Sequence, residues 1–432
     1  MSNKSHAVKE AAKHTRAPKV RFPEFRDAEG WEETELQKLA RPVSERAING
    51  DGDKVLSLSG EHGIVLQSDY FGKKVAGDNA ERYIKIARND FVYNDRTTKQ
   101  SVYGTIKRLS QYEGGIVSPI YKCFRFNSEE NPVFWEWYFE SGVHESELGG
   151  LVNEGARAGR FNISIDNFLS TSVYHPNVPE QQTIAECLTS LDRVIDAHDQ
   201  KLDALKAHKK GLMRQLFPRE GETVPRLRFP EFQDSPEWIS DSLGNIFETS
   251  SGGTPERSVK EYWNGNIPWI TTSLVDFNVI RNSDEFISEM GLRNSSAKMF
   301  QKKTVLIAMY GQGKTRGKVA LLGIEATTNQ ACAAILPRED IDPYFVFLNL
   351  AGRYDEMRGL SNSGGQENLS QGLIKGLPFS YPNDIAEQQK LSACLSSFDE
   401  LITAQTEKLE ALKTHKQGLM QQLFPSTAEV ES

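Results

Sequence analysis

A long helical segment occurs twice in this sequence, and the duplication limits the fold more than any other feature. The first copy begins at Glu180 and ends at Pro218, and the second begins at Glu387 and ends at Pro425, a constant offset of 207 residues. Within each copy apolar residues recur in steps that alternate between four and three residues. An average step of about 3.5 residues is the repeat of a coiled-coil seam. Two matching seams in one chain are predicted to bury each other as helices of about 55 Å, at about 1.5 Å per residue.

Polar residues interrupt these seams at two repeated positions. His198 and its repeat equivalent Gln405 occupy one, and Lys209 and Lys416 occupy the other. Such residues are either tolerated at the flank of the seam or fix the register, because a polar seam residue selects one alignment at a cost in stability. We favour the register role for His198 and Gln405. The first seam comprises Ile184, Leu188, Leu191, Ile195, His198, Leu202, Leu205, Lys209, Leu212 and Leu216.

A shorter signature is repeated at the same offset. Residues 21–25 read Arg-Phe-Pro-Glu-Phe and are followed by Trp31, while residues 228–232 have the same five residues and are followed by Trp238. The chain is therefore two tandem copies of one plan, in which a short arm, a large domain and a long helix follow one another. A repeat of this length is a duplicated domain pair and not a solenoid.

The large segments, 31–176 (the first domain) and 238–383 (the second domain), have equal length but align poorly with each other. Both contain short β-like runs punctuated by Gly, Asn and Asp, and each is predicted to contain a short helix, near 133–141 and 343–351. The repeated parts should perform one task twice, and the dissimilar parts two different tasks. The predicted boundaries are a polar tail at 1–17, the first domain with its arm at 18–176, a central helix at 177–221, the second domain with its arm at 222–383, a C-terminal helix at 384–426 and a tail at 427–432.

Composition sets further limits. A chain of 432 residues is too long for one ordinary domain. The four cysteines show no spacing typical of zinc or disulfide frameworks, and neither a signal peptide nor a long apolar run is recognised, so a cytoplasmic protein is expected. The net charge of −8 argues against a uniformly basic nucleic-acid coat, but it allows local basic faces.

Basic residues gather in one stretch of each domain. Residues 82–125 carry nine Lys or Arg against Asp90, Asp95 and Glu113, and residues 293–318 carry seven with no acid at all. Interleaved tyrosines at positions 93, 103 and 310 suit contacts to phosphates and base edges. Either cluster alone is equally well explained as a solvated face. Their presence in both domains favours DNA.

One stretch imitates a nucleotide-binding loop. Ala308 to Thr315 reads Ala-x-x-x-x-Gly-Lys-Thr, but the following residues, 316–322, predict a strand, whereas a nucleotide loop requires a helix whose N-terminus faces the phosphates. We therefore predict a hairpin that presents Lys314 and Arg316. No metal-ligand spacing, hydrolase constellation or methyltransferase motif is recognised, so the sequence predicts no catalytic or metal site.

Together these features resemble the specificity subunit of type I restriction-modification enzymes. The resemblance rests on the duplicated Glu-Gln-Gln helix starts, the Gly-Leu-Met-x-Gln-Leu-Phe-Pro helix ends and the two unlike domains. The second domain adds motifs similar to those of the family's target-recognition domains, at 252–255 (Gly-Gly-Thr-Pro), 262–270, 328–330 and 366–370. The first domain lacks the Gly-Gly-Thr-Pro and Tyr-Trp-Asn-Gly motifs, and its residues 93–94 and 115–121 resemble another branch of the family.

The resemblance implies a non-catalytic reader of α+β fold. Two β-rich target-recognition domains would be joined by two long helices that pair as an antiparallel coiled coil with internal pseudo-twofold symmetry. Each domain would bind half of a bipartite, asymmetric DNA site, and the helices would set the gap and hold two methyltransferase subunits. These partners methylate adenine with S-adenosylmethionine, and motor-nuclease subunits join to cleave DNA with ATP and magnesium. No cofactor is expected on this chain itself.

The predicted site residues fall into two groups. For DNA binding they are Arg96, Lys99, Tyr103, Lys107, Arg108, Arg157, Arg160, Thr254, Lys298, Lys314, Arg316, Lys318, Asn329, Gln330, Gln366 and Asn368. For the subunit interface they are Glu180, Gln181, Gln182, Phe217, Glu387, Gln388, Gln389 and Phe424. Two other functions stay open at this point. One is an enzyme that binds nucleotide at 308–315, and the other is a scaffold whose β-rich domains bind protein or carbohydrate. Salt-sensitive binding to duplex DNA separates the reader from the scaffold.

Overall fold

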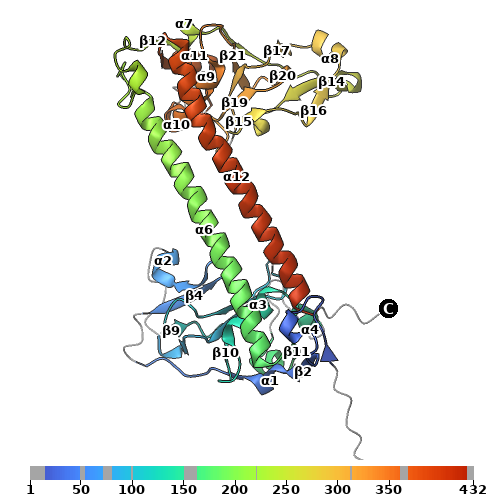
Figure 1. Cartoon of the computed structure of the whole chain (residues 1–432). Coiled ribbons are helices and arrows are strands. Elements are labelled where there is room, and N and C mark those ends of the chain that lie inside the picture. Colours follow the sequence, from blue (N-terminus) through green and yellow to red (C-terminus); the bar gives the residue numbers. More distant parts are fainter. Residues whose placement is uncertain are drawn as a thin grey trace, which may run out of the picture. The chain divides into compact units, whose positions relative to one another are not determined.

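The computed structural model describes residues 15–48, 54–71, 80–98, 101–149, 163–219, 221–311, 314–360 and 368–425. The chain divides into a first unit, residues 1–198 with 409–432, and a second unit, residues 199–408. The two long helices are α6 (Val178–Leu216) and α12 (Ile385–Leu423), and each contributes one half to each unit (Figure 1).

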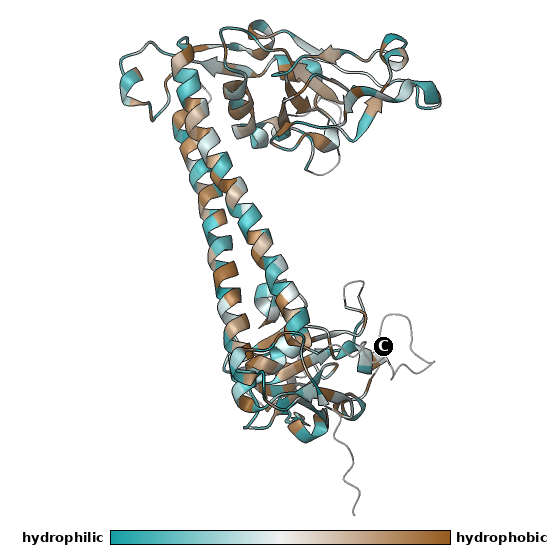
Figure 2. Ribbon diagram, turned by 45° about the vertical axis from the view of Figure 1, so that its right-hand side comes forward, coloured by the Kyte–Doolittle hydropathy of each residue, from teal (hydrophilic) through white to brown (hydrophobic). Residues whose placement is uncertain are grey.

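The halves of α6 and α12 pair antiparallel within each unit. In the first unit, Ile184 at the start of α6 shares a core with Leu423 at the end of α12. In the second unit, Leu216 at the end of α6 shares a core with Leu391 and Leu395 near the start of α12. Hydrophobic and hydrophilic residues alternate along both helices (Figure 2), as the heptad pattern requires. The predicted burial of one seam by the other is confirmed.

Ion pairs join the two helices across the seam. The Lys209 Nζ lies 2.5 Å from Asp399 Oδ1 in the second unit, and Lys416 pairs with Asp192 in the first. The two pairs are repeat equivalents at the offset of 207 residues. The seam lysines are therefore not flank residues that the coil merely tolerates. Gln405 is buried and His198 half-buried, and their register role stays a prediction.

In the described residues, the first domain and its arm contain three small sheets. Their strand orders are β1-β2-β11, β3-β10-β7-β8 and β5-β4-β9-β6. The strands are β1 (Thr15–Arg16), β2 (Trp31–Glu35), β3 (Ala40–Pro42), β4 (Val55–Ser59), β5 (Gly63–Leu66), β6 (Ile84–Ala87), β7 (Phe91–Asn94), β8 (Thr105–Arg108), β9 (Gly114–Val117), β10 (Lys122–Phe126) and β11 (Ser172–His175). The short helices are η1 (Pro23–Phe25), α1 (Leu36–Leu39), α2 (Gln67–Phe71), η3 (Ala80–Arg82), α3 (Pro132–Glu140), α4 (Glu145–Gly149) and α5 (Ile165–Leu169).

An aromatic core connects the first domain to the helices. Phe91 and Phe124 stack with ring centroids 5.3 Å apart, and Phe134 of α3 packs edge-on against Trp31 at 5.7 Å. Phe424, just past the end of α12, contacts Trp31 at 6.0 Å and is fully buried. The arm, the domain and the helix end thus form one core.

The second domain is built from different sheets. Their strand orders are β12-β22, β13-β21-β18-β19-β15 and β16-β14-β20-β17. The strands are β12 (Ile239–Ser242), β13 (Thr249–Ser251), β14 (Trp263–Ile270), β15 (Asn278–Ile280), β16 (Glu285–Ile287), β17 (Met299–Phe300), β18 (Val305–Ala308), β19 (Val319–Leu322), β20 (Ala326–Thr328), β21 (Cys332–Ile335) and β22 (Pro378–Tyr381). The short helices are η4 (Pro230–Phe232), α7 (Leu243–Ile246), η5 (Lys260–Tyr262), η6 (Thr272–Leu274), α8 (Glu289–Arg293), α9 (Pro343–Gly352), α10 (Tyr354–Gly359) and α11 (Gln371–Lys375).

The predicted α+β class is confirmed, with β-rich domains on long paired helices. The two short helices expected near 133–141 and 343–351 are α3 and α9, and each begins at a polar cap. The Asn131 side chain accepts hydrogen bonds from the first turn of α3, as the Asp342 side chain does for α9. Within the described part of the chain, no helix is both long and apolar enough to cross a membrane.

Candidate nucleic-acid interface

The acid-free stretch of the second domain leaves several cations open to solvent. Arg293, Lys298, Lys302, Lys303 and Lys314 are exposed, and none forms an ion pair with a residue that the structure describes. Lys318 differs, because its Nζ lies 2.6 Å from Asp276 Oδ1. The open cations are therefore available for phosphate contacts.

The predicted hairpin is present, but Arg316 does not lie at its surface. Strands β18 and β19 pair antiparallel, so a strand and not a helix follows the Ala308–Thr315 stretch. This geometry argues against the nucleotide-binding enzyme. Lys314 is exposed, whereas Arg316 is 9% exposed and its Nη2 donates to the Arg358 carbonyl at 3.0 Å. Arg316 thus braces the loop against α10, and this placement corrects the expectation that both side chains face outward.

The Gly-Gly-Thr-Pro motif forms a loop pressed against the end of β20. A Cβ on Gly252 would lie 2.0 Å from the Thr328 carbonyl oxygen, and one on Gly253 would lie 2.3 Å from Ser296 Oγ. Only glycine permits so close an approach. The loop brings together two predicted residues that are far apart in sequence, because Thr254 Oγ1 donates to Gln330 Oε1 at 2.5 Å.

Two further predicted residues lie beside this loop. Lys298 Nζ donates to Ser250 Oγ at 3.0 Å, at the end of β13 just before the motif. Asn329 is half-buried, and its Oδ1 accepts from the Ala331 backbone at 3.1 Å, which shapes the turn after β20. Thr254, Lys298, Asn329 and Gln330 therefore lie around this loop. Its residues 252, 253 and 255 are buried, whereas Lys298 and Gln330 are exposed. This polar group is the candidate DNA-contacting surface of the second domain.

The other motifs of the second domain have structural roles in this fold. Residues 262–270 include a register shift in β14 between Trp263 and Ile267, with Asn264 at a φ of 59°. The Arg257 guanidinium lies over the Trp263 ring at 3.8 Å and over the Trp269 ring at 4.7 Å. This stacking holds the satellite core between β14 and β16 together.

The last motif, 366–370, is described only from Asn368 onward, so Gln366 lies outside the described residues. Asn368 is half-buried. The Leu369 backbone donates to the Met309 carbonyl at 3.0 Å, and the Ser370 side chain caps α11. This part of the motif anchors the segment before α11 to the end of β18.

The predicted cations of the first domain lie in a different setting. Lys107 pairs with Glu140 of α3. Both Arg108 Nε and Nη2 donate to Glu136 Oε2, at 2.9 and 2.6 Å. Burial raises the pKa of Glu136 despite this partner. Helix α3 thus supplies the acids that neutralise β8. The DNA contacts predicted for Lys107 and Arg108 stay predictions, and they would have to compete with these ion pairs.

Other cations of the 82–125 cluster are also paired. Arg125 binds Asp90, which is fully buried, with Nε to Oδ1 at 2.5 Å. Lys122 pairs with Asp95, and Arg88 with Glu113. Arg96 is exposed without an ion pair to a described residue, and Tyr103 is half-buried with its backbone carbonyl accepting from the Tyr93 hydroxyl at 2.6 Å. Lys99, Arg157 and Arg160 lie outside the described residues.

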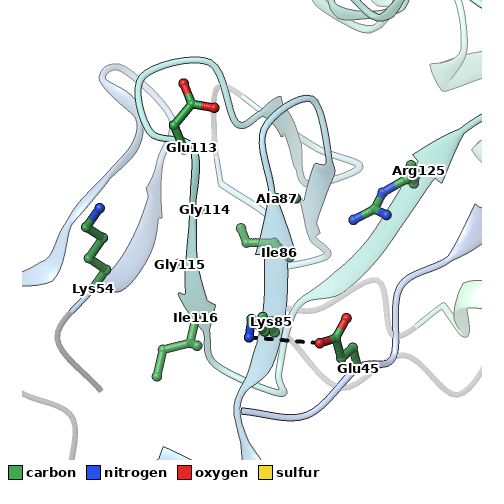
Figure 3. Close-up of a pocket in the computed structure, with 10 residues that line it drawn as sticks. All are labelled: Glu45, Lys54, Lys85, Ile86, Ala87, Glu113, Gly114, Gly115, Ile116 and Arg125. Atoms are coloured by element: carbon green, nitrogen blue, oxygen red, sulfur yellow. Dashed lines mark ion pairs between the residues drawn. The ribbon is translucent and has the colours of Figure 1, made fainter. Parts of the chain in front are cut away.

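A pocket of 500 Å³ lies beside β6 and β9 in the first domain (Figure 3). Lys85 faces Glu45 across it, with Nζ and Oε1 4.0 Å apart. Glu113 and Arg125, which also line it, are paired to residues outside the lining, Arg88 and Asp90. Apart from the exposed Lys54, the charged residues of the lining are paired, so we assign no ligand to the pocket.

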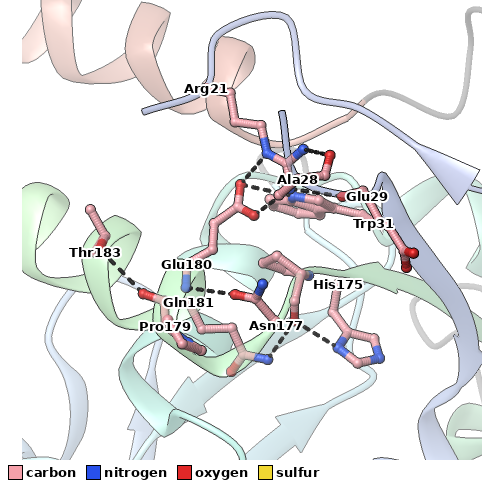
Figure 4. A network of polar contacts seen from close by, with 11 residues as sticks. Arg21, Ala28, Glu29, Trp31, His175, Asn177, Pro179, Glu180, Gln181 and Thr183 are labelled. Atoms are coloured by element: carbon pink, nitrogen blue, oxygen red, sulfur yellow. Dashed lines mark hydrogen bonds and ion pairs between the residues drawn. The ribbon is translucent and has the colours of Figure 1, made fainter. Parts of the chain in front are cut away.

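The duplicated helix starts form matching anchors. Arg21 holds the Glu180 carboxylate through Nε at 2.7 Å and Nη2 at 2.6 Å, and the Trp31 indole donates to the same carboxylate at 3.3 Å (Figure 4). The hydrogen-bonded carboxylate raises the pKa of Arg21. In the second unit Arg228 holds Glu387 at 2.8 and 2.7 Å, and Trp238 donates at 3.3 Å.

The glutamines that follow these glutamates continue the anchors. Gln181 Oε1 accepts from the Asn131 backbone at 3.0 Å, and Gln388 Oε1 accepts from the Asp342 backbone at 2.8 Å. Each bond joins the start of a long helix to the start of α3 or α9. The buried glutamate and glutamine thus connect arm, domain and helix within each unit.

The remaining predicted interface residues differ in exposure. Gln182 and Gln389 are exposed and remain candidates for contacts with another subunit. Phe424 is buried in the first core, and Phe217 is half-buried against Phe345 at 5.4 Å. Part of the predicted subunit interface is therefore internal. The repeat alone could not distinguish internal from external contacts, because residues of both kinds recur at the same offset.

Comparison with known proteins identifies the second half of the chain. Residues 236–414 match the family model of the type I restriction modification DNA specificity domain. The sequence is 29% identical over 182 residues to the type I restriction enzyme MjaIX specificity subunit of Methanocaldococcus jannaschii, covering 41% of either chain. It is 30% identical over 179 residues to the EcoR124I/EcoR124II specificity subunit of Escherichia coli, covering 40% of this chain and 43% of that one. The matched stretch thus spans about two fifths of these relatives.

The fold likeness extends over most of the chain. The S subunit of a type I system from M. genitalium aligns with 95% of this chain and 100% of its own, at a TM-score of 0.56 and 14% identity. A chain from a type I R-M system complex aligns with 92% of this chain and 98% of its own, at a TM-score of 0.59 and 15% identity. Residues 236–414 thus match the specificity domain, and most of the chain shares the fold of these S subunits.

The comparisons support the two domains to different extents. The family model covers the second domain and most of α12, where the Gly-Gly-Thr-Pro loop and the open cations lie. The first domain joins the specificity-subunit fold through the structural alignments. The residues that sequence reasoning missed are the anchoring arginines and tryptophans of the arms, although the repeated arm signature already contained them.

Proposed function

We propose that this specificity-subunit relative is a non-catalytic DNA reader that recognises a bipartite, asymmetric site. The observation that carries the proposal is the attachment of two unlike β-rich domains to duplicated helices through one repeated Arg–Glu–Trp anchor. Matching anchors that hold two different domains suit one molecule that reads two different half-sites. The specificity-domain match over residues 236–414 supports DNA as the ligand.

In this proposal the paired helices set the distance between the half-sites. Two methyltransferase subunits dock on the chain and methylate adenine with S-adenosylmethionine, and motor-nuclease subunits use ATP and magnesium to cleave DNA. These cofactors belong to the partners, and the complex works in the cytoplasm, where the DNA lies. The relatives named as specificity subunits of type I restriction enzymes support this division of labour.

The proposal is tested with the full chain and its methyltransferase. Adenine methylation mapped across a host genome should fall at one sequence with two unlike halves and a fixed gap. The purified complex should bind that duplex with an affinity that declines steeply as salt rises, because phosphate contacts release counterions. Binding that ignores salt, or absence of any common methylated sequence, would leave a non-DNA scaffold as the better reading.

A further inference from the structure

A stripe of three cations follows the face of α6 that borders the second domain. Lys206, Lys210 and Arg214 succeed one another at intervals of four residues, so they lie on one helix face, about 6 Å apart along the axis. All three side chains are exposed, and none forms an ion pair with a described residue. The stripe lies in the second unit, between that unit's boundary at residue 199 and the helix end.

The stripe forms one wall of a groove of 870 Å³ in the second unit. Phe277, Phe347 and Tyr354 contribute to the other lining. The acids of the lining are Asp355 and Asp399, and Asp399 is neutralised by Lys209. Arg219 also lines the groove, so its cations outnumber its acids and its field is positive.

The groove continues into the basic hairpin. The Tyr354 hydroxyl donates to the Lys314 carbonyl at 2.5 Å, and the Tyr354 ring packs edge-on against Phe277 at 5.2 Å. Tyr354 therefore joins the groove wall to the loop that carries the exposed Lys314. Open cations extend from the hairpin, past this tyrosine, to the helix.

The internal repeat shows that the coiled coil does not require these cations. The positions equivalent to Lys210 and Arg214 are Gln417 and Gln421, which are also exposed. The neighbouring seam residue Leu212 keeps its leucine, as Leu419. The seam is thus retained in both copies. Two of the three stripe cations occur only in the copy that borders the second domain, and the third, Lys206, is matched by Lys413.

We propose that Lys206, Lys210 and Arg214 bind the phosphate backbone of the duplex in the gap, beside the half-site read by the second domain. This inference rests on the proposed function and extends it from the domains to the spacer helix. Phosphate contacts need charge and position but no base-edge geometry, which suits lysine and arginine on a solvated helix face. The continuity with Lys314 favours DNA over an acidic protein partner as the occupant.

The test exchanges the stripe for the residues of its own repeat. The double variant carries Lys210→Gln and Arg214→Gln in the full chain. Its binding to the target duplex, whose sequence is known from the methylation map, is measured by fluorescence anisotropy between 50 and 200 mM salt. We expect about a tenfold loss of affinity, and a salt slope shallower by about 1.8, since each phosphate interaction that is removed lowers the slope by about 0.9. The loss should be equal for different gap sequences, because phosphates carry no base identity.

A single pair of variants gives the matched control. Lys206→Gln removes a stripe cation without an ion pair, whereas Lys413→Gln removes its repeat equivalent, which pairs with Glu410 at 3.2 Å. Only Lys206→Gln should flatten the salt slope. Ethylation interference should show that the phosphates bound by the parent chain, but not by the double variant, lie in the gap beside the second half-site.

The outcomes separate this inference from the proposed function. If the unmodified chain binds no duplex, the proposed function itself fails. If it binds and the double variant keeps the same affinity and slope, the stripe does not contact DNA. A variant that binds DNA normally but no longer recruits the methyltransferase overturns the inference in favour of an acidic protein partner.

Discussion

The two domains treat their basic residues in opposite ways. In the first domain the cations of β8 are held by Glu136 and Glu140 of α3, and those of β10 by the buried Asp90 and Asp95. In the second domain the acid-free stretch leaves Lys298 and Lys314 exposed. Clusters of similar composition therefore produce a braced domain in one case and an open cationic surface in the other.

This difference shows that the number of cations in a segment does not measure its field. A lysine or arginine bound to a carboxylate contributes little net charge to a distant phosphate, and it costs a bond to release. Exposure without an acidic partner is the property that matters for DNA contacts. The candidates for base contacts in the second domain are therefore the residues of its Gly-Gly-Thr-Pro loop and of its hairpin.

The largest expected effect concerns a fragment of residues 1–221, which contains one arm, one domain and one helix. It lacks Met420, Leu423 and Phe424, which complete the first core. Their repeat equivalents Met213, Leu216 and Phe217 are present in a second copy of the fragment. We expect two fragments to pair about a true twofold axis, because burial of the bare seam is favourable by about 25 cal/mol per Å² of apolar surface.

Sedimentation should then show a dimer. Co-expression with the methyltransferase should give adenine methylation at an inverted repeat of the first half-site, because both domains of such a dimer are the same. A monomeric fragment, or methylation that stays at the original asymmetric site, would contradict the equivalence of the two helix ends.

The next largest effect should come from the anchors, where the two units are alike. Glu180→Gln leaves the Arg21 guanidinium buried without its counter-charge, which costs about 3 kcal/mol of the free energy of unfolding. Glu387→Gln should cost a similar amount in the second unit, since Arg228 and Trp238 make the same contacts. Denaturant unfolding, with hydrogen exchange to assign each unit, measures both. If the two variants lose different amounts of the free energy of unfolding, the two anchors differ in strength despite their matching geometry.

The sequence predicted those parts of the fold whose signals are local. The heptad seam and the repeated arms follow from residue types at fixed spacing, and they predicted the paired helices and the tandem plan. The ion pairs of the first domain could not be predicted, because Arg108 and Glu136 are separated by 28 residues and meet only once β8 packs against α3. The basic cluster seen in the sequence ends at Arg125, before α3 begins. The two acids that neutralise β8, Glu136 and Glu140, therefore lie outside it.

The candidate site shows the same limit. The motifs at 252–255 and 328–330 identified the loop of the second domain. Paired glycines in a sequence indicate a close approach of the backbone, and Gly252 and Gly253 make such an approach here. The burial of Arg316 gave no such signal, since its partner carbonyl on Arg358 lies 42 residues away. The repetition of Glu180 and Glu387 is compatible with an internal anchor and with an external interface, so the sequence could not decide between them.

An intermediate effect should separate the two kinds of cation directly. Lys298→Ala with Lys314→Ala should weaken DNA binding by about 1–3 kcal/mol if one of them contacts a base edge, with stability unchanged. Arg108→Ala should instead lower the free energy of unfolding by about 1 kcal/mol, because it removes a partly buried pair with Glu136. Anisotropy and thermal unfolding of each variant provide the check. If Arg108→Ala impaired DNA binding while the fold kept its stability, the braced role of β8 would be wrong.

The smallest effect concerns the ion pairs across the seam, which are repeat equivalents with different neighbours. Both pairs are partly exposed, so a double-mutant cycle on Lys209 and Asp399 should yield a coupling of only about 0.3–1 kcal/mol. In the second unit the Tyr344 hydroxyl also donates to Asp399, at 3.2 Å. In the first unit Lys416 lies 4.3 Å from the Trp137 ring centroid as well as beside Asp192.

A cation over an aromatic face adds about 0.5–1 kcal/mol, and methionine keeps the apolar stem of lysine while it removes this term. Lys416→Met should therefore destabilise the chain more than Lys209→Met, although the two lysines occupy the same position in the repeat. Chemical denaturation of both variants beside the parent chain measures the difference. Trp137→Leu in the Lys416→Met background should then add no further electrostatic loss. If the two lysine variants unfold at the same denaturant midpoint, the contact with the Trp137 ring adds no measurable stability to the Lys416 pair.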